Sequence, residues 1–279
     1  MNLEVKELIK VIHQTYGRDI SMYDRSFIEK SLKIRWIATG IKTVSAYLEY
    51  LSQNYTEADA FFRSLNITYS EFFRNLLAFV LLEQWILPKL IEKKSGGGEI
   101  RVWSAGCAAG QEAYSITLLL NEFDALRTNK IRYRIFATDI SESVLTSARQ
   151  GVYDAATVQN VRLKHIKEYF IKQGETYSIS SVLKERVNFS AYDLLDKFSD
   201  YPQGSIYGDF DLVFCSNLLF YYRPEIQQFI LHKMGRSMSE NGYLVTGEAE
   251  RTLVGEKCGM RAVAPPASIF QKKRNRGVL

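Results

Sequence analysis

The sequence predicts an α/β protein, in which a largely parallel sheet with helices on both faces follows a small all-helical domain. Three observations support this fold class. Apolar residues recur at helical spacing over residues 1–92, and strand-like runs alternate with helical segments after residue 98. Residues 99–120 give a buried strand, a small-residue turn and an apolar helix, in that order. Such alternation is typical of parallel strands, because each connection must cross back over the sheet.

The helical domain is expected to cover residues 1–94. Its first helix shows apolar residues at helical spacing, and Gly17 ends it. The segment Ser95–Gly98 reads Ser-Gly-Gly-Gly, a composition typical of flexible linkers, and the periodicity changes across it. We therefore predict a domain boundary between residues 94 and 95.

The second domain, residues 95–279, is expected to hold the sheet. Strands are predicted at residues 100–104, 133–138, 210–215 and 243–246, with helices from residue 112, over 141–150 and over 224–238. Residues 153–192 depart from this alternation, because 177–180 and 186–189 read as short alternating strands. They predict a small antiparallel insert at about residues 170–192.

The turn between the first strand and its helix is a candidate ligand site. A helix that starts there presents free backbone N–H groups and the positive end of its dipole. Gly106 and Gly110 are four residues apart, which gives neither the dinucleotide fingerprint nor a phosphate loop with its lysine. A ligand without a pyrophosphate suits this turn, although a glycine needed only for packing gives the same pattern.

Polar residues follow three predicted strands at their carboxyl ends, where open parallel sheets bind ligands. They are the turn up to Glu112, Asp139 after the second strand, and Asn217 after residues 210–215. The two oxygens of a carboxylate match the two hydroxyls of a ribose, so Asp139 is a candidate ribose ligand. Asp139 could instead cap the helix that follows, and Asn217 could serve a turn. Their coincidence at three strand ends favours a ligand site.

Composition narrows the class of protein. The chain has 279 residues, of which 46% are hydrophobic. It has no apolar run of about 18 residues or more, so we expect a soluble cytoplasmic protein without membrane insertion. Three scattered cysteines and three histidines form no ligand cluster, so no metal is expected. The net charge of +5 owes much to the basic segment 271–279, which is more typical of a solvated end than of a nucleic-acid arm.

The run Phe72-Phe73-Arg74 is the candidate site in the helical region. We expect at least one of the two phenylalanines to pack in the core. Arg74 follows them directly, and we expect it either to pair with Glu71 or to point into a cleft.

Six segments then occur in a characteristic order. They are NITYSEFFR (Asn66–Arg74), WSAGCAAGQEAYS (Trp103–Ser115), ATDIS (Ala137–Ser141), DLL (Asp193–Leu195), FCSNLLFYY (Phe214–Tyr222) and GEAE (Gly247–Glu250). In order and spacing they resemble the CheR-type family of chemotaxis receptor glutamate O-methyltransferases. The resemblance implies a helical domain before a Rossmann-like, class I S-adenosylmethionine-dependent methyltransferase domain. It implies S-adenosyl-L-methionine as cofactor and, as partner, the cytoplasmic domain of chemotaxis receptors or a related protein.

The resemblance also assigns cofactor contacts to the matching residues. The turn at Gly106 would wrap the methionine part, Glu112 would contact its amino group, and Asp139 would hold the ribose. Asp193 and Leu194 would flank the adenine. The remaining cofactor contacts that the resemblance implies are Thr68, Ser70, Arg74, Ser216 and Asn217.

Arg74 and Tyr221 are the catalytic residues that the resemblance implies, with Arg74 reaching over from the helical domain. Because the sulfonium methyl is already activated, alignment and electrostatics matter more than acid–base groups. Arg74 would hold a glutamate carboxylate bidentately, while Tyr221 would donate a hydrogen bond to it.

The chain departs from the family motifs at several positions. The changed positions are Thr68 for asparagine, Ala108, Ala109, Gln111 and Ala113 in the turn, Ser216 for arginine, and Glu248 and Ala249 in place of His-Ser. Two other functions therefore stay open. One is a regulatory protein that binds S-adenosylmethionine or S-adenosylhomocysteine without transfer activity, and the other is a methyltransferase with a different substrate.

Overall fold

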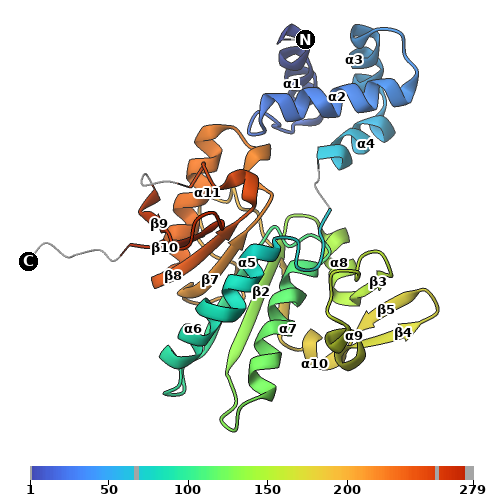
Figure 1. The fold of residues 1–279 in the computed structure, drawn as a ribbon. Coiled ribbons are helices and arrows are strands. Elements are labelled where there is room, and N and C mark those ends of the chain that lie inside the picture. Colours follow the sequence, from blue (N-terminus) through green and yellow to red (C-terminus); the bar gives the residue numbers. More distant parts are fainter. Residues whose placement is uncertain (1, 66–68, 255–257, 274–279) are drawn as a thin grey trace, which may run out of the picture. The chain divides into compact units, whose positions relative to one another are not determined.

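The computed structural model describes residues 2–65, 69–254 and 258–273 (Figure 1). The chain divides into two compact units. The first, called the helical unit, comprises residues 1–67 and 218–228, and the second, called the sheet unit, comprises residues 68–217 and 229–279. Within the described ranges, no helix combines the length and apolar character that crossing a membrane requires.

The helical unit is built from short amphipathic helices. They are α1 (Asn2–Tyr16), α2 (Arg25–Thr39), α3 (Val44–Gln53), α4 (Tyr55–Leu65) and the 3₁₀ helix η2 (Leu219–Tyr221). The apolar faces of α1 to α4 meet in one core that includes Leu8, Tyr47 and Phe61. The Glu57 carboxylate joins three of these helices, because it accepts hydrogen bonds from the Arg35 guanidinium (2.6 Å) and the Tyr47 hydroxyl (2.9 Å).

The segment 218–228 completes the helical unit, although it follows β7 of the sheet unit in sequence. The Asp24 amide donates to the Tyr221 carbonyl (2.7 Å). Tyr23 and Tyr222 form an isolated β-bridge, and their rings stack with centroids 5.3 Å apart. A pairing between segments so remote in sequence leaves no local signature.

The sheet unit contains two sheets and the helices around them (Figure 1). The strands are β1 (Ile100–Ala105), β2 (Tyr133–Asp139), β3 (Val152–Asp154), β4 (Phe170–Gln173), β5 (Thr176–Ile179), β6 (Val187–Ala191), β7 (Phe210–Cys215), β8 (Met238–Thr246), β9 (Met260–Ala262) and β10 (Ile269–Lys272). The helices are α5 (Leu76–Leu81), the π-helix η1 (Leu82–Ile86), α6 (Leu87–Lys93), α7 (Gln111–Ala125), α8 (Glu142–Gln150), α9 (Leu163–Tyr169), α10 (Ser181–Lys184), α11 (Pro224–Ser237), which begins in the helical unit, and the 3₁₀ helix η3 (Glu248–Glu250).

The main sheet has the strand order β6-β2-β1-β7-β8-β10-β9. The strands from β6 to β8 are parallel, and β10 and β9 add an antiparallel edge. In the view of Figure 1, helices α5 and α7 pass in front of this sheet. All six residues of β7 are buried, and all but Asp211 are apolar. The Asp211 carboxylate accepts the amide of Arg101 (3.1 Å) and pairs with Lys94 (2.9 Å). The expected α/β class is confirmed, and the parallel order brings the carboxyl ends of β2, β1 and β7 to one edge.

The boundary between the two units differs from the one expected at residues 94 and 95. Helices α5, η1 and α6 belong to the sheet unit, because Phe79, Ile86 and Ile91 share a buried cluster with Ile100 of β1. Helical periodicity shows that a face is buried but not which partner buries it. The run Ser95–Gly98 forms an exposed turn between α6 and β1.

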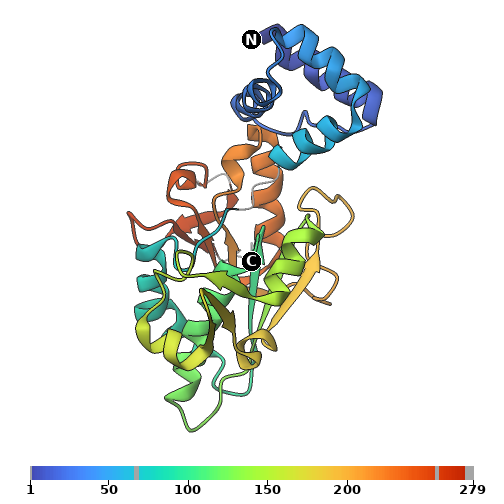
Figure 2. The same ribbon diagram turned by 90° about the vertical axis from the view of Figure 1, so that its right-hand side faces the viewer.

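The antiparallel insert also has different limits from those expected. The small sheet has the order β3-β5-β4 and lies beside α9, outside the main sheet (Figure 1 and Figure 2). It therefore begins earlier, with β3. The predicted insert strand at 186–189 was wrong, because β6 pairs in parallel with β2, with Val187 opposite Ile135. A half-exposed alternating strand at a sheet edge looks the same in sequence whichever sheet it joins.

Candidate active site

The turn after β1 is fastened to the end of β2. The amides of Gly106 and Cys107 both donate to the Thr138 carbonyl, at 2.8 and 2.9 Å. Gly110 has a φ of +89°, and an added Cβ would lie 3.1 Å from the Phe189 ring, so this position requires glycine. Ala108 also has a left-handed φ, +46°. Non-glycine residues hold this strained conformation where surrounding contacts enforce it, as they often do at binding sites.

Asp139 at the end of β2 supplies one of those contacts. One carboxylate oxygen accepts the amide of Ala108 (3.0 Å) and the other accepts the amide of Ser141 (2.9 Å). Burial raises the pKa of Asp139, and these backbone hydrogen bonds oppose that rise. A carboxylate can accept about four hydrogen bonds, and the amides of Ala108, Ser141 and Ile140 leave acceptor capacity for a ligand hydroxyl. The local bond to Ser141 and a ribose contact are therefore compatible.

Glu112 lies in the first turn of α7. Its carboxylate accepts hydrogen bonds from the hydroxyls of Ser104 (2.7 Å) and Ser216. Burial, helped by the negative charge of Glu250, raises the pKa of Glu112 to about 7, against the lowering effects of these hydroxyls and of Arg74. A carboxyl group in this state gains most from a ligand that brings a positive charge.

The ends of β7 and β8 are held together by Glu250. One oxygen of its carboxylate accepts the amides of Asn217 and Gly247, each at 2.8 Å. Asn217 has a left-handed φ of +59°, and a Cβ on Gly247 would lie 2.7 Å from the Asn217 side-chain nitrogen. Sequence reasoning quoted Glu250 only as part of a motif. The signal available for it was an acidic residue four positions after the end of a buried strand.

The candidate adenine residues lie next to Asp139. The amide of Tyr192 donates to the backbone carbonyl of Asp139 (3.0 Å), which brings the following residues to the carboxyl end of β2. Leu194 is buried, and Asp193 is exposed, with its carboxylate accepting the amide of Leu195 (2.8 Å).

Arg74 belongs to the sheet unit and not, as expected, to the helical one. Its two neighbours fix its place: the Phe73 amide donates to the Ser115 hydroxyl on α7 (3.0 Å), and the Asn75 side chain donates to the Thr246 carbonyl at the end of β8 (3.3 Å). Arg74 itself is exposed. Its guanidinium lies 5.2 Å from the centre of the Tyr69 ring.

Both phenylalanines before Arg74 are in the core, as expected for at least one of them. Phe72 is fully buried, with its ring edge-on to Tyr153, and Phe73 is 8% exposed. The Glu71 carboxylate accepts the Tyr69 hydroxyl, while Arg74 donates to the Tyr69 carbonyl (3.4 Å).

The structure thus brings most of the predicted residues to one edge of the main sheet. Those at or next to the carboxyl ends of its strands are Gly106, Glu112, Asp139, Asp193, Leu194, Ser216 and Asn217. Ser70 is half-buried in the segment before Arg74, and Thr68 lies outside the described residues. Tyr221 belongs to the helical unit, where its ring packs on Phe27 with centroids 4.7 Å apart. Ser104 was missed, although a serine within an apolar strand was a visible signal.

Fold and site together define a class of protein. A glycine turn after β1 and an acid after β2 suit a nucleoside, and a second carboxyl group at Glu112 suits a positively charged amino group. The expected cofactor fits these residues, because Glu112 gains from a cation and Asp139 retains free acceptor sites. The site is that of an α/β enzyme that binds a nucleoside carrying an amino acid.

Comparisons with known proteins agree with this class. Residues 68–263 match the family model described as "CheR methyltransferase, SAM binding domain", and residues 3–65 match "CheR methyltransferase, all-alpha domain". The chain belongs to the CheR methyltransferase family. It is a methyltransferase, and its cofactor is S-adenosyl-L-methionine.

Curated relatives carry the same description. A chemotaxis protein methyltransferase of Borreliella burgdorferi is 30% identical over 91% of this chain and 89% of its own length. Chemotaxis protein methyltransferase 1 of Pseudomonas aeruginosa is 35% identical over 64% of each chain. The chemotaxis protein methyltransferase of Salmonella typhimurium is 30% identical over 88% of this chain and 82% of its own length. The likeness therefore extends over both units.

Proposed function

We propose that this protein transfers a methyl group from S-adenosylmethionine to glutamate carboxylates in the cytoplasmic domain of chemotaxis receptors. The observation that carries the proposal is the placement of Arg74, whose charge acts on the Glu112 carboxyl. The neighbours of Arg74 fasten it to the second turn of α7 and to the end of β8. A cation in this place can receive a carboxylate substrate beside the cofactor. The names of the curated relatives support the receptor as substrate.

The proposed roles of the residues are those that the family resemblance implies, and the contacts described above support them. Asp139 holds the ribose hydroxyls, Asp193 and Leu194 flank the adenine, and Glu112 receives the amino group of the methionine part. Ser216 and Asn217 line the pocket near that part. When bound, the cofactor supplies a methyl group on a sulfonium that is ready for transfer. The Arg74 fork holds both oxygens of the substrate carboxylate, which orients one of them for attack.

The proposed reaction needs no general base. A glutamate side chain is ionised at neutral pH and is therefore already nucleophilic. Tyr221, in the family position beside the reacting carboxylate, is proposed to donate a hydrogen bond to it.

The first test is calorimetric titration of the full chain with S-adenosylhomocysteine, in which we expect saturable one-site binding. The second is incubation with radiolabelled S-adenosylmethionine and a cytoplasmic receptor fragment. Label should enter the fragment and be released by mild base, because carboxyl methyl esters hydrolyse there. Replacing the fragment's methyl-accepting glutamates by alanine is the control.

Each outcome has a distinct meaning. Label that resists base would point to another acceptor group and thus to another substrate class. Binding without label in any fragment would favour a regulatory protein instead. If S-adenosylhomocysteine did not bind at high micromolar concentration, the proposed function would be wrong.

The affinity for S-adenosylhomocysteine should depend on pH through Glu112. Its pKa of about 7 means that the carboxylate is mostly protonated at pH 6 and mostly ionised at pH 8. Only the ionised form pairs with the ligand's amino group, so the dissociation constant should fall about tenfold between pH 6 and pH 8. The Glu112→Gln variant should bind weakly at both values. A wild-type affinity that stays flat between them would contradict the proposed contact.

A further inference from the structure

His165 lies in the apolar layer directly behind the Phe-Phe-Arg motif. It belongs to α9, next to the small sheet, and its side chain is fully buried. Its ring is nearly parallel to that of Phe73, with 23° between the planes and 6.3 Å between the centroids. Phe73 is the residue immediately before Arg74, so the His165 ring faces the side chain next to the residue that presents the guanidinium.

Phe73 is held in a strained conformation. Its φ of +53° is left-handed, which is unfavourable for an aromatic residue and persists only where several contacts enforce it. Ser115 accepts its amide, and the Phe79 ring packs edge-on against it at 5.1 Å. The His165 ring is the third contact. If one of these three contacts is lost, the Phe73 backbone can relax to a more favourable conformation. The Arg74 side chain then points in a different direction.

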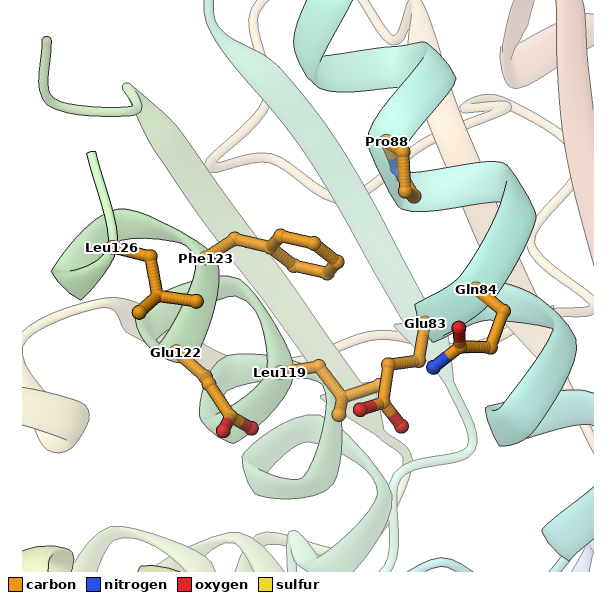
Figure 3. A pocket seen from close by; sticks show the side chains of 7 residues that line it. All are labelled: Glu83, Gln84, Pro88, Leu119, Glu122, Phe123 and Leu126. Carbon is orange, nitrogen blue, oxygen red and sulfur yellow. The ribbon is translucent and has the colours of Figure 1, made fainter.

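A network of charges fixes the His165 ring. The Nε2–H of His165 donates to a Glu122 carboxylate oxygen (2.9 Å), and Lys164 donates to the other oxygen (2.8 Å). Arg162 lies 3.6 Å from Glu122 and forms a two-pronged pair with Glu83 of the π-helix η1. Figure 3 shows the Glu83 and Glu122 carboxyl groups pointing to the same side, at a pocket of about 240 Å³ between α7 and η1.

Helix α7 connects this network to the site. Glu122 lies near its C-terminal end, Ser115 in its second turn, and Glu112 in its first turn. One rigid helix therefore holds the histidine, the strained Phe73 and the cofactor's carboxyl partner in a fixed relation.

Hydrogen bonding alone does not account for a histidine in this place. Its Nδ1 is buried and has no hydrogen-bond partner within the described part of the chain. An unmade bond in a buried site is unfavourable, and an apolar side chain would avoid it. Histidine adds a flat ring that faces the Phe73 ring. The hydrogen bond to Glu122 sets the orientation of this ring.

We propose that His165 is a positioning residue for methyl transfer: held by Glu122, its ring keeps Phe73 in the left-handed conformation and thereby directs Arg74. The consequence for transfer rests on the proposed role of Arg74 with the substrate carboxylate. The effect on Phe73 does not rest on it, which allows the two to be tested apart.

The structural test is amide hydrogen exchange of the full chain, followed by NMR. In His165→Leu, the Phe73 amide should exchange at least about tenfold faster, because its bond to Ser115 opens more often. Lys164→Gln is the matched control, since it removes another Glu122 partner but leaves the ring, and Phe73 should be unchanged. The amides of β7 report on the global fold. His165→Gln keeps the donor and loses the ring, so it should behave like His165→Leu if that variant does not fold.

The kinetic test compares His165→Leu in the wild-type and Arg74→Lys backgrounds. We expect kcat to fall about tenfold in the first and less in the second, with KM for S-adenosylmethionine within about twofold, because the residue acts through Arg74. An unchanged Phe73 amide overturns the proposal. Equal losses in both backgrounds overturn the coupling to Arg74. If the wild-type chain transfers no methyl group while Phe73 still responds, the proposed function fails and the positioning of Phe73 stands.

Discussion

Replacing Asp139 by alanine is expected to weaken S-adenosylhomocysteine binding by about 100-fold or more. A carboxylate that accepts two ribose hydroxyls makes two charge-assisted hydrogen bonds, each worth about 1.5–3 kcal/mol, and about 1.4 kcal/mol corresponds to tenfold in affinity. The same change also removes the acceptor of the Ala108 amide, so the strained turn loses one of its supports. Both effects weaken binding, and calorimetry of the two proteins measures their sum.

Asp139→Asn separates the two contributions. The amide keeps one oxygen for the turn or for a hydroxyl but loses the charge, so its affinity should lie between those of the wild type and Asp139→Ala. Asp193→Ala is a useful comparison, because that carboxylate is exposed and accepts a single local amide. If Asp139→Ala bound S-adenosylhomocysteine as tightly as the wild type, Asp139 would not be the residue that binds the ribose.

Replacing Arg74 by alanine is expected to lower kcat about 100-fold while the dissociation constant of S-adenosylhomocysteine changes by less than about threefold. Arg74 is exposed and acts on Glu112 only electrostatically. The cofactor should therefore keep most of its contacts in the Arg74→Ala variant. The substrate carboxylate loses both hydrogen bonds that orient it. Steady-state kinetics with a receptor fragment, together with calorimetry, give the two quantities.

Arg74→Lys should recover part of the loss, because lysine restores the charge but not the two-pronged geometry. Arg134→Ala serves as the matched control: this arginine is also exposed, pairs with Glu99, and lies near the amino end of β2. An Arg74→Ala protein with normal turnover would show that the substrate carboxylate is held elsewhere.

The central strands β1, β2 and β7 and the second half of β8 were predictable because most of their residues are buried. Residues 210–215 are apolar apart from Asp211, and β7 has those same limits. The local sequence could not show which sheet a strand joins or which core a helix packs against. The β6 strand has the pattern of any edge strand, and only its pairing with β2 assigns it to the main sheet. The boundary near residue 67 depends in the same way on which core buries Phe79.

The site shows the same division. Asp139 and Asn217 could be found because polar residues at the carboxyl ends of parallel strands are conspicuous. The carboxylate of Glu250, which joins two strand ends, and the hydroxyl of Ser104 beside Glu112 depend on contacts between remote segments. The left-handed backbone of Phe73 runs against the preference of its residue type, so only the surrounding structure accounts for it.

The division of the chain limits how this protein can be shortened or recombined. The backbone crosses between the two units three times, near residues 67, 217 and 228. A polypeptide starting at residue 68 would retain Tyr221 and Tyr222 but lose Phe27 and Tyr23, the aromatic partners of their rings. The helical unit is therefore not a detachable module. In a chimaera with a relative, the helical unit should keep its internal packing only if residues 1–67 and 218–228 are exchanged together.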